Sequence, residues 1–145
     1  MNSVYNSSFE IALRIILLLN SCKCSYTADR IAAVDTIAIY GKNFGITADN
    51  LHGDSNYYIG EYAAKRRTVQ RALKRLVLDG YVFPRQAGGT IIYSITEPGE
   101  LYAKELSAVY AQEYCENVNL AVSFSKHLTD RKIVNLVSTD RRQTI

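Results

Sequence analysis

The sequence has few of the residues from which metal sites and disulfide frameworks are built. It contains three cysteines and two histidines in 145 residues. Cys22 and Cys24 form one Cys-x-Cys pair, but a structural zinc site needs four ligands, and the remaining cysteine, Cys115, stands alone, as do the two histidines. An odd number of cysteines without a secretory signal also argues against a disulfide framework. We therefore expect ordinary thiols, no metal and no bound cofactor.

Long apolar runs are also missing. The longest, Ile11 to Leu19, is interrupted by Arg14 and is much shorter than the roughly 20 residues that a membrane-spanning helix needs. Polar residues and Glu10 precede it, where a signal peptide would carry basic residues. These features predict a cytoplasmic protein with no membrane contact.

A strong charge of one sign is absent as well, since the net charge is only +3. The molecule as a whole is no polycation, so any case for nucleic-acid binding depends on where its basic residues lie. Apolar residues make up 48% and charged residues 21%, which is ordinary for a globular fold and argues against disorder. The length suits one domain with a real core.

The common signatures of enzymes are not found. The sequence has no glycine-rich phosphate-binding loop, no His-Glu-x-x-His motif and no nucleophile elbow, and its acidic residues form no obvious pair. His52 and Asp54 lie two residues apart, but no nucleophile or metal set accompanies them. We expect a protein that catalyses nothing and has no catalytic residues.

The first half of the sequence predicts two helices and a long loop. Ser8 is a good N-cap for a helix that begins at Phe9 and ends near Asn20, with an apolar face opposite Arg14. A second helix begins at Thr27 and ends at Gly41, which a loop rich in turn-forming residues follows from Gly45 to Gly60. Such a loop is longer than most connections, so it is either functional or a mere connector.

The second half predicts a helical pair, a hairpin and further helices. A short helix, a turn, and a helix with Thr68 as its N-cap precede the closing Asp79-Gly80. The remaining expected elements are strands at 81–83 and 90–96 around a turn at 86–89, helices at 100–118 and 130–137, and a loose end at 141–145.

This order predicts an α+β, mostly helical fold, specifically a winged helix-turn-helix with N-terminal helices and a C-terminal helical extension. The recognition helix would be Thr68 to Leu78, and the wing would be Tyr81 to Thr96. We expect a winged-helix domain over residues 1–118 and a helical tail over residues 119–145.

Basic residues gather on the expected recognition helix. The segment from Lys65 to Arg75 holds six basic residues in eleven and no acidic one. Such a face is typical of DNA binding, but it also suits an acidic protein partner or a merely solvated surface. Gln70 could pair with adenine, and Arg67 or Arg71 with guanine. The candidate residues for binding DNA or a partner are Arg66, Arg67, Gln70, Arg71, Lys74, Arg75 and Arg85.

Several segments resemble the middle components of bacterial ABC three-component systems. The most specific is the loop Asn50, Leu51, His52, Gly53 and Asp54. The others are Phe9–Ile15, Asp29–Asp35 with Tyr40, Phe44–Thr47, Glu61-Tyr62 with Arg66 or Arg67, Ala72–Lys74, Leu76-Val77 with Gly80, and Tyr93–Thr96 with Gly99.

The resemblance implies an accessory subunit rather than an enzyme. Proteins of this kind are encoded beside an SMC/Rad50-like ABC ATPase and an effector, often a nuclease, and the related Lamassu-type systems act in defence against phage or plasmids. The expected role is an adaptor that joins the ATPase to its effector and contacts double-stranded DNA directly or within the complex. The alternative is a free-standing winged-helix transcriptional regulator, which would bind duplex DNA alone as a dimer.

Overall fold

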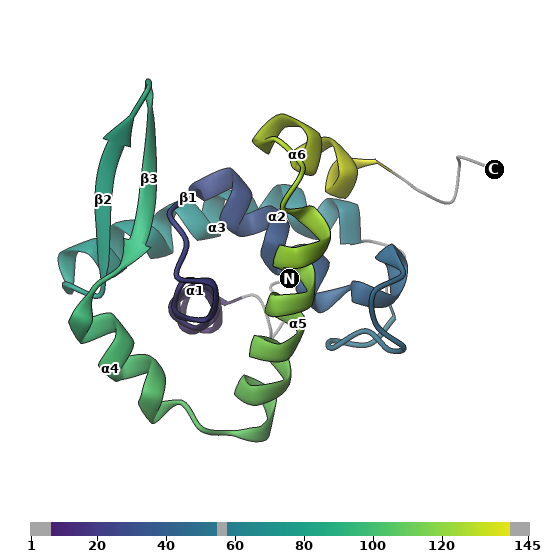
Figure 1. Ribbon diagram of the computed structural model, residues 1–145, viewed down its shortest axis with the longest axis horizontal. Helices are drawn as coiled ribbons and strands as arrows, with labels where there is room; N and C mark the ends of the chain where they lie inside the picture. Colours follow the sequence, from purple (N-terminus) through teal and green to yellow (C-terminus); the bar gives the residue numbers. More distant parts are fainter. Residues whose placement is uncertain (1–6, 55–57, 140–145) are drawn as a thin grey trace.

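The computed structural model describes residues 7–54 and 58–139, which fold into a mostly helical α+β structure (Figure 1). Residues 55–57 of the expected loop at 45–60 and the expected loose end at 141–145 lie outside the described residues, and the helix that follows the loop already begins at Tyr58, inside that expected loop. Within these ranges there are six α-helices, one short 3-10 helix and three strands. They are α1 (Ser8–Cys22), β1 (Tyr26–Thr27), α2 (Ala28–Ile39), η2 (Gly41–Phe44), α3 (Tyr58–Leu78), β2 (Val82–Ala87), β3 (Thr90–Ile95), α4 (Glu97–Glu105), α5 (Val109–Ser125) and α6 (Asp130–Ser138).

The first helix lies at the centre of the fold. Figure 1 shows α1 end-on, and it packs against α2, α3, α4 and α5. Its N-cap is Ser7 rather than Ser8, because the Ser7 hydroxyl accepts a hydrogen bond from the Glu10 amide at 3.3 Å. The expectation that Arg14 lies on a polar side is wrong: its side chain is buried, since Asp35 of α2 supplies a carboxylate inside the core.

The basic segment belongs to one long helix. Instead of a short helix, a turn and a second helix, α3 runs without interruption over 21 residues. Thr68 is therefore a mid-helix residue and caps nothing. No proline interrupts this stretch, and Val69, Leu73 and Leu76 are all buried on the side that faces the core, which holds the helix in one piece.

The three strands form a small antiparallel sheet in the order β1-β3-β2. Tyr26 of β1 pairs with Tyr93 of β3, and Arg85 of β2 pairs with Ile92 of β3. Strand β2 is longer than expected and the turn is correspondingly shorter. Gly88 and Gly89 both have positive φ, at 51° and 82°, which suits a two-residue hairpin turn whose twist matches that of the strands.

The C-terminal half contains two helices where the sequence predicted one at 100–118. The first, α4, begins after the N-cap Thr96, and the second, α5, extends to Ser125. The last helix, α6, follows the N-cap Thr129 close to its expected position and packs against α2 and α3.

No helix among the residues that the structure describes is long and apolar enough to cross a bilayer.

Candidate functional site

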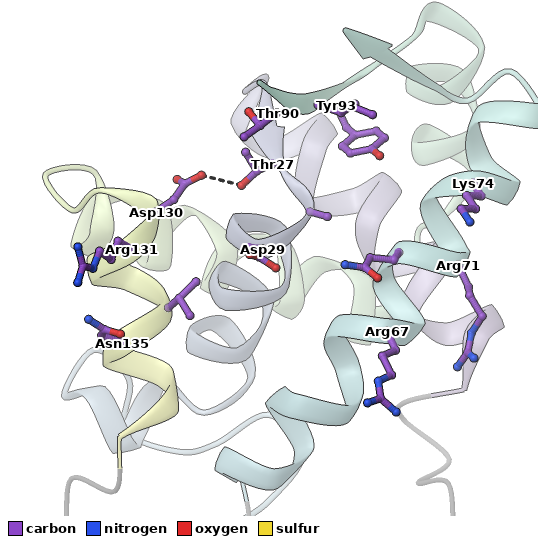
Figure 2. A pocket seen from close by; sticks show the side chains of 14 residues that line it. Thr27, Asp29, Arg67, Arg71, Lys74, Thr90, Tyr93, Asp130, Arg131 and Asn135 are labelled. Atoms are coloured by element: carbon purple, nitrogen blue, oxygen red, sulfur yellow. Dashed lines mark hydrogen bonds between the residues drawn. The ribbon is translucent and has the colours of Figure 1, made fainter. Parts of the chain in front are cut away.

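A groove of about 840 Å³ runs between α3 and α6 (Figure 2). Strand β3 and the start of α2 complete its lining. The residues that line it are Thr27, Ala28, Asp29, Arg67, Gln70, Arg71, Lys74, Thr90, Ile91, Tyr93, Asp130, Arg131, Val134 and Asn135. Elements from both halves of the chain thus meet at one concave surface.

Four cations face this groove. Arg67, Arg71 and Lys74 belong to the α3 wall, and Arg131 belongs to the α6 wall. All four side chains are exposed, and none of them takes part in the ion pairs found among the described residues. Helical spacing brings Arg67, Arg71 and Lys74 to one face of α3, where like charges repel one another unless an anion lies nearby.

The acidic residues of the groove are already neutralised by other cations. Asp29 accepts hydrogen bonds from Arg66 of α3, with the shortest oxygen–nitrogen distance at 3.1 Å. Asp130 of α6 forms an ion pair with Arg30 at 2.9 Å and accepts a hydrogen bond from the Thr27 hydroxyl at 2.7 Å. The groove therefore carries a net positive charge that nothing within it compensates.

Two consecutive residues in the first turn of α2 hold the two walls of the groove. Asp29 binds Arg66 on α3, whereas Arg30 binds α6 and the turn before it. The Arg30 guanidinium also donates to the carbonyl oxygens of Ser125 at 2.9 Å and Leu128 at 2.8 Å. Its side chain is only 11% exposed, so this contact is well shielded from water.

The residues that the sequence nominated for binding do not all meet at the groove. Arg67, Gln70, Arg71 and Lys74 line it together. The other nominated cations lie elsewhere: Arg66 is paired with Asp29, Arg75 with Asp79 at 3.2 Å, and Arg85 is exposed on β2 outside the lining.

Lys65, which we counted in the basic segment, does not belong to the exposed face at all. It is 2% exposed and contacts Asp35 at 2.9 Å. Conversely, sequence reasoning missed Arg131, Asn135 and Tyr93, because no spacing along the chain brings α6 or β3 to the side of α3.

A buried cluster of charged and polar groups joins α1, α2, α3 and α5. Asp35 contacts Arg14 and Lys65, both at 2.9 Å, and accepts a hydrogen bond from the Tyr114 hydroxyl at 2.6 Å. Burial alone would raise the pKa of Asp35, but the charges of Arg14 and Lys65 outweigh it and hold this pKa well below its ordinary value. Burial lowers the pKa of Lys65, although Asp35 opposes the shift.

The loop from Asn50 to Asp54 is anchored at its first half and exposed at its second. The Asn50 side chain accepts from the Lys42 amide at 3.0 Å and donates to Asn43 at 2.9 Å, and the Leu51 amide donates to Ile39 at 2.8 Å. Gly53 and Asp54 are exposed, and Gly53 has a φ of 80°. None of these five residues lines the groove.

His52 connects this loop to the buried cluster. Its Nε2 lies 2.5 Å from the Tyr110 hydroxyl, and the two rings stack with their centroids 5.8 Å apart. Burial, reinforced by the nearby charge of Arg14, lowers the pKa of His52 to about 3, so the ring is neutral at physiological pH. The part of the chain that the structure describes holds no group of three or more His, Cys, Asp or Glu side chains that could bind a metal ion.

Comparison with protein families identifies the chain. Residues 4–145 match the family described as ABC-three component (ABC-3C) system Middle Component 2. The chain belongs to this family. A Middle Component 2 protein is one part of a multi-component, defence-associated system, so it acts as an accessory subunit together with the other components. Comparisons with curated proteins and with solved structures gave no match.

Proposed function

We propose that this Middle Component 2 protein is a non-catalytic adaptor in an anti-phage or anti-plasmid complex of the Lamassu-like type. It joins an SMC/Rad50-like ABC ATPase to an effector such as a nuclease, and its groove contacts an anionic surface within the assembly. The observation that carries this proposal is the set of four uncompensated cations on the groove walls of a chain that belongs to a multi-component family.

The proposal includes a winged-helix module. The order α1-β1-α2-α3-β2-β3, with β1 and β2 on either side of β3, supports this assignment. In it, α3 takes the position of the recognition helix and the β2–β3 hairpin that of the wing. Many folds serve unrelated functions, so the role is argued from the groove and not from the fold.

Family membership favours the adaptor over a free-standing transcriptional regulator. A regulator would bind duplex DNA without other subunits and would read base edges through α3. A middle component instead works with its neighbours, and a basic groove can be completed by them.

Co-purification tests the proposal. We expect the tagged chain, expressed with the ATPase and effector encoded beside it, to retain both, and we expect loss of the chain to abolish protection against phage. The double substitution Arg71→Glu with Lys74→Glu should reduce phage protection at least tenfold, because it reverses the charge of one groove wall.

The matched control is Lys104→Glu with Lys126→Glu, which changes the net charge equally at two exposed positions outside the groove. Full protection without the chain, or retention of neither partner, would contradict the adaptor role. Equal loss of protection in both double variants would contradict a role for the groove in particular.

A further inference from the structure

The groove makes α3 one wall of a hollow, and this limits how it can meet nucleic acid. A recognition helix enters the major groove of DNA as a projecting element, and that groove, about 12 Å wide, admits one helix of about 10–12 Å diameter. Here α6 lies on the other side of the hollow (Figure 2), and Arg131 and Asn135 contribute to its lining. A narrow anion that enters the space between the two helices fits this hollow better than a duplex does.

We infer that this groove binds single-stranded nucleic acid, with its phosphates on the two basic walls and a base against Tyr93. The inference rests on the proposed function in one respect, which is that the groove meets an anionic partner. Single-strand sites in proteins combine a basic groove that follows the backbone with aromatic rings on which bases stack. Both parts are present here.

The spacing of the cations suits a phosphodiester chain. Arg67, Arg71 and Lys74 are separated by four and three residues, so they extend over roughly 10 Å of α3 at a rise of about 1.5 Å per residue. Each phosphate of a nucleic-acid strand carries one negative charge, so a row of three cations on one helix face can contact neighbouring phosphates of the same strand. Arg131 reaches the same strand from the opposite wall.

The remaining lining favours nucleobases over an acidic peptide. Tyr93 presents an aromatic ring to the hollow, and every base has a π face that can stack on it. Gln70 and Asn135 lie on opposite walls, and an amide side chain both donates and accepts hydrogen bonds, as base edges require. Acidic peptides would satisfy the cations and the two amides as well, but Asp and Glu side chains have no flat ring to stack on Tyr93.

Two arginines distinguish this mode from binding of duplex DNA by a projecting helix and wing. Arg131 lies in the groove but outside the winged-helix elements, whereas Arg85 lies on the wing but outside the groove. Single-strand binding in the groove requires Arg131 and not Arg85. Duplex binding through α3 and the wing requires Arg85 and not Arg131.

Fluorescence anisotropy with the full chain tests the inference. The probes are labelled 12-nucleotide oligothymidine, oligouridine of the same length, and a 12-base-pair duplex, each over a range of salt concentrations. We expect at least one single-stranded probe to bind about tenfold more tightly than the duplex. The affinities for oligothymidine and oligouridine then show whether the groove prefers single-stranded DNA or RNA. Arg131→Glu should weaken that binding about tenfold and Arg85→Glu less than twofold.

Tyr93 provides a second readout. Tyr93→Phe keeps the ring and should retain single-strand binding, whereas Tyr93→Leu should weaken it severalfold while its circular dichroism spectrum remains that of the folded protein. If Tyr93→Leu fails to fold, the comparison of Arg131→Glu with Arg85→Glu still tests the inference.

Three results would overturn the inference. They are tighter binding of the duplex with dependence on Arg85, stronger competition by polyglutamate than by unlabelled oligonucleotide, and no binding of any nucleic acid. Assembly of the wild-type chain with the ATPase and effector is measured in parallel. If the chain assembles but binds no nucleic acid, only the single-strand site is rejected. If the chain does not assemble with either protein, the adaptor role is rejected.

Discussion

Arg14 of α1 and Asp35 of α2 form a bidentate ion pair in the core. The Arg14 Nε lies 2.9 Å from Asp35 Oδ1 and its Nη2 lies 3.2 Å from Oδ2. Lys65 of α3 approaches Oδ2 of the same carboxylate at 2.9 Å, and all three side chains are at most 6% exposed. One buried anion thus contacts two buried cations, and it joins three helices that are distant in the sequence.

Asp35→Asn should be among the most destabilising substitutions in the protein. It leaves the charges of Arg14 and Lys65 buried without their counterion, and breaking a buried pair in this way costs about 3–5 kcal/mol. Urea denaturation followed by circular dichroism measures the decrease in the free energy of unfolding. Asp79→Asn, which breaks the exposed pair with Arg75, is the control and should cost less than about 1 kcal/mol. Similar losses in the two variants would show that the buried pair is not special.

Lys65→Met should cost less than half as much as Asp35→Asn. It removes the excess positive charge, so that Arg14 and Asp35 remain as a neutral pair, and methionine fills much of the volume. Thr36 loses the hydrogen bond from Lys65 but still donates to the Ala32 carbonyl at 2.9 Å. The same denaturation experiment compares the two variants, and an equal loss would mean that the lysine charge itself is required.

Stability should fall on mild acidification because of His52. The pKa of His52 is lowered to about 3 in the folded protein, whereas an unfolded histidine titrates near about 6.5. The unfolded chain therefore binds the proton first. The contribution of the neutral His52 ring to folding stability is fully present above about pH 6.5 and is lost as the pH falls toward about 3. Allowing for the partial exposure of the ring, we expect a loss of about 1 kcal/mol between pH 7 and about pH 5.

Melting temperatures at the two pH values check this prediction. His52→Gln should reduce the difference in melting temperature between the two pH values. His127→Gln, at an exposed position, should leave this difference as in the wild type. An unchanged acid response in His52→Gln would assign it to other groups.

Gly53→Ala should destabilise the protein by about 1 kcal/mol, through backbone conformation alone. The φ of 80° is unfavourable for residues with a side chain, but a Cβ built at this position meets no atom within 4 Å. Gly53→Asn should cost less, because asparagine tolerates the left-handed region. Thermal melts of both variants provide the measurement. A large and equal loss for both would indicate a steric contact in place of a conformational preference.

Local signals predicted α1, α2, α6 and the hairpin. The helices expected from Thr27 and from residue 130 begin directly after the N-caps Thr27 and Thr129, and each cap accepts a hydrogen bond from the amide three residues later. The break between α4 and α5 escaped prediction because Ala108, the N-cap of α5, has no side chain that can make a capping bond. The two-residue strand β1 is likewise too short for a periodic pattern.

Long-range pairing could not be predicted from the sequence. Helical spacing predicts a polar face for Arg14 because a lone charge on an apolar helix usually points to water, and nothing in the pattern indicates Asp35 as its partner. The α3 wall of the groove was predictable, since its cations follow helical spacing. Its α6 wall was not, because it depends on a contact between residues 100 positions apart, Arg30 and Asp130.

The attachment of both groove walls to Asp29 and Arg30 has a consequence for affinity. These neighbouring residues share one turn of α2, and α2 also packs against both α3 and α6, so the two walls have a common support. A ligand therefore meets a preorganised surface, and little of the binding free energy is spent on ordering the protein. Any event that shifts the first turn of α2 would change both walls at once, which would alter binding at every position along the strand together.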